Sequence, residues 1–191
     1  MPPSIRNPTL SSNTCRLDFA CGAYGENQLN YAGPSQGIRR IYPMEGYQVV
    51  FEHEVLFRDI DAMRHVNNVA FVAFMEDARM EYWKALTRVQ ELKGINFILA
   101  EVSCRYLSPA YLGETIRIGI RARNLSNKSF QFEYRMEDKA SGRLITEGGS
   151  VQVMYDYKQK KTMPLEQKMR DTVAALEKVP MEELSSSEGS R

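Results

Sequence analysis

The order of secondary structure is set by the stretch Arg58-Asp59-Ile60-Asp61-Ala62-Met63-Arg64-His65-Val66-Asn67-Asn68, because the hydrophobic period changes across it. Residues 47–58 alternate apolar and polar side chains, which is typical of a half-buried strand. From residue 68 to about 88, apolar residues recur every three or four positions, which is typical of a helix. Asparagine is a favoured helix N-cap, so we expect the polar stretch to end at a helix N-terminus.

That junction is a chemically useful place for charged side chains. The first backbone N–H groups of a helix have no partner within the helix, and the helix dipole is positive at this end. Together they stabilise a developing anion. The carboxylates of Asp59 and Asp61 and the imidazole of His65 are therefore expected beside an anion-stabilising helix start.

Four more strands are predicted after the helix. Alternating apolar and polar residues place them over about 95–107, 114–124, 129–138 and 144–157. Ser141-Gly142 suits a hairpin turn, and consecutive antiparallel pairing is the simplest topology. Because the long helix has a broad apolar surface that must be covered, we expect an α+β fold in which a curved antiparallel sheet of about five strands wraps one long helix.

Three parts are expected along the chain. Residues 1–44 are rich in Pro, Ser, Asn and Gly without a sustained period, which indicates an irregular N-terminal extension. Its arginines outnumber its acidic residues, a weak likeness to an organelle-targeting peptide. Residues 45–158 form the α+β domain. Residues 159–191 form a short helix from Pro164 to about Lys178, then a mobile tail from Met181.

Composition excludes several classes of function. The 25 basic and 24 acidic residues leave a net charge of +1. The chain therefore has no overall positive potential that would attract nucleic acid or an anionic membrane surface. No apolar run approaches the roughly 20 residues that span a bilayer. Three cysteines and two histidines lack metal-ligand spacing, so no metal site is expected. An odd cysteine count without a signal segment favours a reducing, cytoplasmic location.

A family resemblance accounts for these features together. The motif Asp-x-Asp-x-x-x-His-Val-Asn-Asn followed by Phe74-Met75-Glu76-Asp77-Ala78-Arg79 resembles the hot-dog fold thioesterases of the 4-hydroxybenzoyl-CoA thioesterase type. The resemblance covers about 47–157, with support from the turn Ser108–Glu114 and from Lys128-Ser129-Phe130. It implies a homodimer or homotetramer that binds acyl-CoA at a subunit interface, with no metal or redox cofactor.

The resemblance also assigns catalytic roles. The family's catalytic aspartate falls on Asp61, as the nucleophile or as the base that activates water. The backbone amide that polarises the thioester carbonyl falls on Asn68. His65 either positions the substrate or supports the loop. These roles agree with the chemistry of a thioester, which has a good leaving group and needs a nucleophile and an oxyanion stabiliser more than a strong acid.

Substrate contacts are expected from three further residues. Asn67 adjoins the helix start, although its side chain suits a cap. Arg64 stands where many family members have glycine, which affects the shape or charge of the entrance. Lys128 is the one residue that matches the family's basic cluster for coenzyme A phosphates, and a solvated loop is the alternative.

Several polar residues are expected to be structural. Asp59 suits loop architecture, and His53 suits a satisfied core or interface position. Glu76 and Arg79 are three apart on the helix, where they form a surface ion pair or hold a buried partner. Cys104 shares a strand face with apolar residues, which suits a buried thiol.

The predicted function is that of an acyl-CoA thioesterase. One alternative is a hot-dog hydratase or dehydratase, although the chain lacks the Asp-x-Asn-Pro-x-His pattern of such hydratases. The other is a module that binds acyl-CoA without turnover. The acyl group, the choice between coenzyme A and acyl carrier protein, and the choice between a nucleophilic and a general-base Asp61 stay open.

Overall fold

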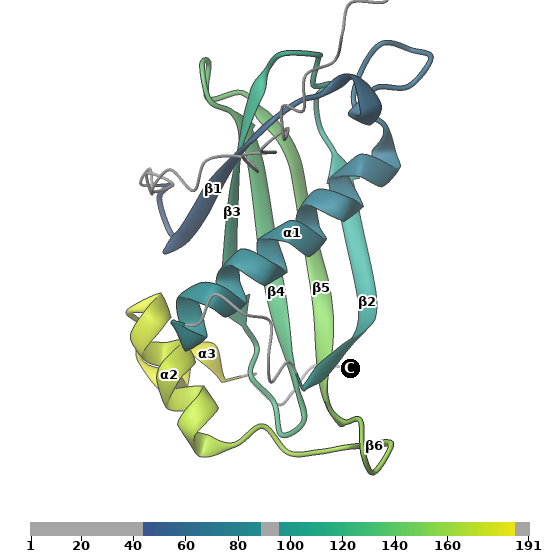
Figure 1. Ribbon diagram of the computed structural model, residues 1–191. Coiled ribbons are helices and arrows are strands. Elements are labelled where there is room, and N and C mark those ends of the chain that lie inside the picture. Colours follow the sequence, from purple (N-terminus) through teal and green to yellow (C-terminus); the bar gives the residue numbers. More distant parts are fainter. Residues whose placement is uncertain (1–43, 89–95, 186–191) are drawn as a thin grey trace, which may run out of the picture. The chain divides into compact units, whose positions relative to one another are not determined.

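The computed structural model describes residues 44–88 and 96–185, so the predicted N-terminal extension lies almost wholly outside the described residues. The helix α1 (Asn68–Thr87) lies across one face of an antiparallel sheet, which we call the inner face (Figure 1). Before it come β1 (Val49–Glu54) and the short 3-10 helix η1 (Phe57–Asp59). The later strands are β2 (Phe97–Tyr106), β3 (Thr115–Arg123), β4 (Ser129–Asp138), β5 (Leu144–Asp156) and β6 (Lys161–Thr162).

The strand order in the sheet is β1-β3-β4-β5-β2, with β6 paired to β5. The expected α+β class and curved sheet are confirmed, but consecutive pairing is wrong for two strands. β1 pairs with β3, and β2 pairs with β5 from Phe97↔Met154 to Tyr106↔Thr146. The physical reason is α1, which carries the chain across the inner face, so that β2 joins the edge opposite to β1 (Figure 1).

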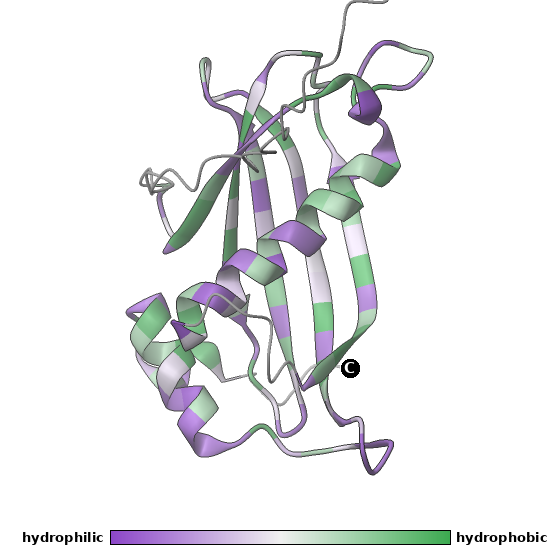
Figure 2. Cartoon of the chain, in the orientation of Figure 1, coloured by the Kyte–Doolittle hydropathy of each residue, from purple (hydrophilic) through white to green (hydrophobic). Residues whose placement is uncertain are grey.

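The core lies between α1 and the inner face. Residues opposite each other in the β3–β4 ladder, such as Ile118↔Met136 and Ile120↔Tyr134, are almost fully buried. The charged residues beside them in sequence are partly exposed on the other face of the sheet. This alternation appears as bands of opposite hydropathy along β3 and β4 (Figure 2). Each large apolar side chain buried there contributes roughly 1.5–3 kcal/mol. The buried residues of α1 are Phe71, Phe74, Met75, Ala78, Arg79, Tyr82, Trp83 and Leu86.

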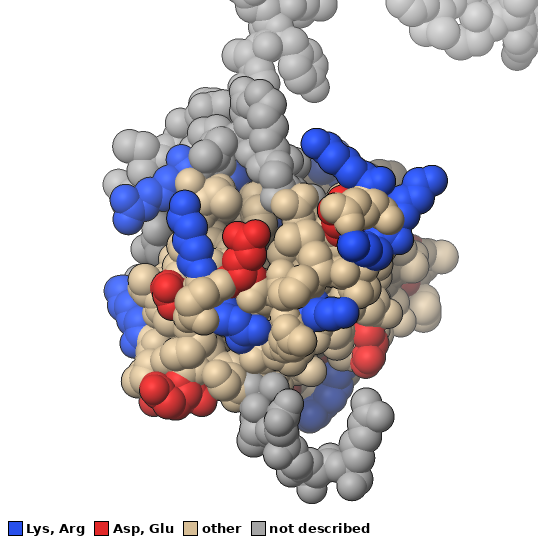
Figure 3. Space-filling view, turned by 90° about the horizontal axis from the view of Figure 1, so that it is seen from below, with Lys and Arg blue, Asp and Glu red and all other residues tan. Residues whose placement is uncertain are grey.

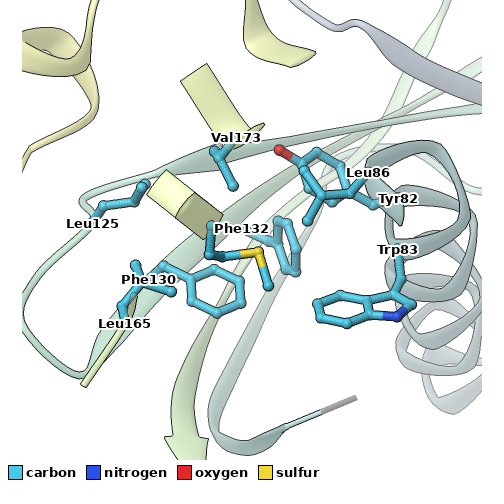
Figure 4. A pocket seen from close by; sticks show the side chains of 9 residues that line it. Tyr82, Trp83, Leu86, Leu125, Phe130, Phe132, Leu165 and Val173 are labelled. Carbon is cyan, nitrogen blue, oxygen red and sulfur yellow. The ribbon is translucent and has the colours of Figure 1, made fainter. Parts of the chain in front are cut away.

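The C-terminal helices close one end of this core. α2 (Gln167–Glu177) lies beside the second half of α1, where apolar side chains from α1, β4 and α2 point toward one another around a small pocket (Figure 4). The sequence placed a mobile tail from Met181. Instead, Met181–Leu184 forms α3, whose Leu184 is fully buried and accepts a 2.6 Å hydrogen bond from the Leu125 amide.

Charge is mixed on the surface at that end. Viewed from below, basic and acidic residues are interspersed across the visible face (Figure 3). This agrees with the balanced composition of the chain. Within the described ranges, no helix is both long and apolar enough to span a bilayer.

Candidate active site

The segment between β1 and α1 folds back on itself as a small hairpin. Ile60 and Val66 form an isolated antiparallel bridge, and the Asp61 amide donates to the His65 carbonyl at 3.0 Å. The Asn67 amide donates to the Asp59 carbonyl at 2.8 Å, which closes the base of the hairpin. These bonds hold Asp61 beside the segment that leads into α1.

Asp59 and His53 anchor the hairpin to the core. The Oδ2 atom of Asp59 accepts from the Leu56 amide at 2.9 Å and lies 3.2 Å from Nε2 of His53. The His53 ring packs on Phe74 of α1, with 4.1 Å between ring centroids. This geometry agrees with the structural roles expected for Asp59 and His53, because both side chains are engaged within the fold.

Asp61 has one oxygen engaged in the loop and one directed at His65. Its Oδ1 accepts from the Met63 amide at 2.8 Å, while Oδ2 lies 3.8 Å from Nδ1 of His65. The Asp61 side chain is 19% exposed, so it is neither sealed in the core nor in bulk solvent. Nδ1 of His65 also lies 3.2 Å from the Val66 carbonyl, a contact that fixes the ring orientation. Among the described residues, Oδ2 of Asp61 thus accepts no hydrogen bond and has His65 beside it.

The first turn of α1 leaves one backbone donor without a partner. The Asn67 side chain caps the helix by accepting from the Val69 amide at 2.9 Å, and the Ala70 amide donates to the Asn67 carbonyl. In the described part of the chain, the Asn68 amide has no acceptor. At the positive end of a helix of 20 residues, this N–H can stabilise an oxyanion.

The end of β2 positions this helix start. The Tyr106 hydroxyl donates to the Asn68 carbonyl at 3.1 Å, and the Tyr106 ring packs against Phe71. Burial, with help from the neighbouring Cys104 thiol, raises the pKa of Tyr106 to about 12, so its hydroxyl stays a donor at neutral pH. The residue order alone gave no signal for this contact, because it joins segments that are far apart in the chain.

Arg64 lies on the tight turn of the hairpin. Its amide donates to the Asp61 carbonyl at 3.0 Å, and its φ is +66°, in the left-handed region. Glycine adopts this region without steric cost, so the backbone conformation agrees with the glycine that the family resemblance leads one to expect at this place. In this chain the position instead carries an exposed guanidinium on the same turn as Asp61.

Lys128 lies at the other end of the sheet from the hairpin. It precedes β4, whereas the hairpin adjoins the end of β1 and the start of β3, where the Val55 amide donates to the Glu114 carbonyl. The ammonium of Lys128 is 3.5 Å from the Thr162 hydroxyl. One copy of the chain therefore brings together Asp61, Arg64, His65, Asn67 and Asn68 but not Lys128. Its phosphate role stays a prediction that needs a second copy.

The side chains of the described residues do not suggest a metal centre. Among them, no group of three or more His, Cys, Asp or Glu side chains could hold a metal ion. The chemistry that the hairpin offers is that of a carboxylate and an imidazole on a loop that leads directly into a helix start.

Comparisons with known proteins agree with this fold. The profile of the Thioesterase-like superfamily matches residues 55–173. A thioesterase from Thermus thermophilus, solved with coenzyme A and Zn, is 31% identical, with a TM-score of 0.65 over 72% of this chain and 99% of that one. The long-chain acyl-CoA thioesterase FadM of Escherichia coli is 24% identical over 62% of this chain and 92% of that protein.

A structure of a 1,4-dihydroxy-2-naphthoyl-CoA thioesterase from Synechocystis shares the fold at 19% identity, with a TM-score of 0.58 over 65% of this chain and 94% of that one. The predicted family is therefore confirmed, and the matched residues include the whole hairpin and α1. The chain belongs to the Thioesterase-like superfamily.

Proposed function

We propose that this chain is an acyl-CoA thioesterase that hydrolyses its substrate at the hairpin, with Asp61 as the reacting carboxylate. The observation that carries the proposal is the pairing of two groups. A carboxylate stands on a loop tied to the start of α1, and within the described residues neither its Oδ2 atom nor the Asn68 amide at that start is engaged in a hydrogen bond. Family membership favours this hydrolase over a hydratase or a non-catalytic binding module.

Two routes fit this arrangement. In the first, Oδ2 of Asp61 attacks the thioester carbonyl, the carbon–sulfur bond breaks, coenzyme A leaves as the thiol, and water then hydrolyses the mixed anhydride. In the second, Asp61 accepts a proton from water, and the resulting hydroxide attacks. Both build negative charge on the carbonyl oxygen, which the Asn68 amide and the helix dipole stabilise. Asp61 is essential in either case.

His65, Arg64 and Asn67 are proposed to support the reaction without taking a covalent part. A protonated His65 would form an ion pair with Asp61 across 3.8 Å, and a neutral ring keeps the hairpin in shape through the Val66 carbonyl. Arg64 presents its charge at the entrance, where the phosphates of coenzyme A would pass. Asn67 positions the first turn through its cap.

A homodimer or larger homo-oligomer is proposed to complete the site. β2 is a ten-residue edge strand of which only Phe97 is buried, and its neighbourhood exposes Leu99, Val102, Tyr106 and Leu107. A long edge strand with exposed apolar residues favours pairing with another chain. Pairing of two copies would bring a second chain against the helix start. Sedimentation of the intact chain at micromolar concentration is expected to give at least a dimer, and a purely monomeric chain would argue against a shared site.

The activity is tested by thiol release over a panel of acyl-CoA thioesters that differ in chain length and ring content. We expect at least one thioester to be hydrolysed to free acid and coenzyme A in equal amounts. An enoyl-CoA included in the panel separates the rival chemistry, because a hydratase would add water without releasing thiol. Tight binding throughout the panel without any thiol release would instead indicate a binding module.

A further inference from the structure

A polar column runs along the inner face beneath α1. In the β2–β5 ladder, Val102 lies opposite Ser150 and Tyr106 lies opposite Thr146, so these side chains share the inner face. Ser150 and Thr146 are buried, and the Thr146 hydroxyl has no hydrogen-bond partner in the part of the chain that the structure describes. On the β2 side the face is open, since Val102 is 37% exposed and Leu99 44% exposed. An acyl group that enters beside the helix start would meet this column.

Arg79 is a buried cation at the middle of α1, where the helix crosses β4 and β5 (Figure 1). It is only 6% exposed, yet no carboxylate of the described residues lies within ion-pair distance of it. Its hydrogen-bond partner among the described residues is the Tyr134 hydroxyl, which accepts from Nη1 at 3.3 Å. A guanidinium has five N–H donors, and within the described residues one of them is engaged, with Tyr134. A buried charge is costly unless an opposite charge accompanies it.

The hydrogen bonds beyond Arg79 cannot supply that charge. The Ser150 hydroxyl lies 2.6 Å from the Tyr134 hydroxyl and 2.6 Å from the side-chain amide of Gln152. The Tyr134 hydroxyl accepts from Arg79 and donates its proton to the Ser150 hydroxyl. The Ser150 hydroxyl in turn donates to the side-chain oxygen of Gln152. All three groups in this series, Tyr134, Ser150 and Gln152, are neutral, so none of them compensates the charge of Arg79. Within the described ranges, no anion accompanies the guanidinium.

We propose that Arg79 recognises a carboxylate at the far end of the acyl group, so that the preferred substrates are coenzyme A monothioesters of dicarboxylic acids. This inference rests on the proposed function for the location of the thioester at Asp61 and Asn68. Eleven residues separate Asn68 from Arg79, about 16 Å along the helix axis. Because helical side chains tilt toward the N-terminus, the guanidinium lies nearer to the helix start than this. An acyl group that reaches from a thioester at Asn68 to the guanidinium of Arg79 is therefore of intermediate chain length.

The experiment compares thioesters that differ only at the end of the acyl chain. Succinyl-, adipoyl-, suberoyl- and sebacoyl-CoA are matched with butyryl-, hexanoyl-, octanoyl- and decanoyl-CoA, and with the corresponding ω-hydroxyacyl-CoA. For the best chain length, kcat/KM is expected to favour the carboxylate by roughly tenfold or more over both the methyl and the hydroxyl end, as a charged hydrogen bond would. Equal or reversed preference in the intact chain overturns the proposal.

Variants assign the preference to Arg79. Arg79→Met removes the charge at similar length, and exchange of a buried charge for an apolar group is often tolerated by the fold. It is expected to abolish the preference while leaving turnover of the methyl-ended thioesters within a few fold. Arg79→Lys is expected to keep part of the preference. Lys84→Met, the same charge change elsewhere on α1, is the control and is expected to leave it unchanged. An equal loss for both substrate classes in Arg79→Met would show a structural role and overturn the proposal.

Binding separates this inference from the proposed function. Calorimetric titration of adipoyl-CoA and hexanoyl-CoA is carried out on the Asp61→Asn variant, in which hydrolysis is blocked. Tighter binding of the carboxylate-ended thioester, lost on adding Arg79→Met, supports the inference even if the intact chain releases no thiol. Hydrolysis of the panel without this difference in binding refutes the inference and leaves the thioesterase function standing.

Discussion

Replacing Asp61 with Asn lowers kcat on the best acyl-CoA by roughly 10²- to 10⁴-fold, the range of a lost general base. The amide cannot accept a proton from water and is a poor nucleophile, so both proposed routes are blocked. Folding is expected to be retained, because the amide oxygen can still accept from the Met63 amide as Oδ1 does now. Steady-state thiol release, with thermal unfolding in parallel, measures the two effects separately.

Asp77→Asn is the matched control for this substitution. Asp77 lies on the exposed side of α1 and undergoes the same chemical change without touching the hairpin. Its turnover is expected to stay within about twofold of the intact chain, as for most exposed substitutions. If Asp61→Asn kept the activity of this control, the hairpin would not be the reacting site.

Replacing Glu177 with Ala is expected to lower the free energy of unfolding by about 2–6 kcal/mol, from two buried donors left unsatisfied at roughly 1–3 kcal/mol each. Oε1 of Glu177 accepts from the Tyr82 hydroxyl at 2.7 Å and from the Ala122 amide at 2.6 Å. It thereby joins α2 to both α1 and β3. Urea unfolding of the two proteins measures the loss, and a change below about 0.5 kcal/mol would contradict this role.

The contribution of Glu177 depends on pH. Burial raises the pKa of this carboxyl above its ordinary value, despite the opposing hydrogen bonds from Ala122 and Tyr82. A group whose pKa is higher in the folded state stabilises the fold fully below its unfolded pKa, and this stabilisation is lost as pH rises through the folded pKa. Relative to Glu177→Gln, which does not titrate, the intact chain should therefore lose stability as pH rises across that interval. Parallel stability profiles would refute the assignment.

Local patterns predicted the elements well. The expected helix over about 68–88 is Asn68–Thr87, and the expected strand 129–138 is found as Ser129–Asp138. Both predictions depend on the spacing of apolar residues within a single segment, which can be read directly from the sequence. The helix start after the polar stretch was also predicted, because a helix cap and the polar residues before it are neighbours in sequence, whereas the folding of that stretch into a hairpin was not predicted.

Long-range features were not predictable in the same way. The pairing of β2 with β5 depends on where α1 delivers the chain, and no residue of β2 encodes its partner. Arg79 and Glu177 look like ordinary surface charges in a helical pattern, and their burial arises only when the sheet and α2 enclose them. Lys128 was grouped with the hairpin by resemblance, although strand direction places it at the other end of the sheet within one copy.

A single-turnover experiment on the intact chain and on Asp61→Asn examines the reacting carboxylate itself. Each protein is mixed in excess with the best thioester of the panel, and free coenzyme A and free acid are quantified over time. The intact chain should release both in equal amounts, while Asp61→Asn should hold the thioester bound and unreacted. Release at the same rate by both proteins would contradict a mechanism in which this carboxylate acts on the thioester.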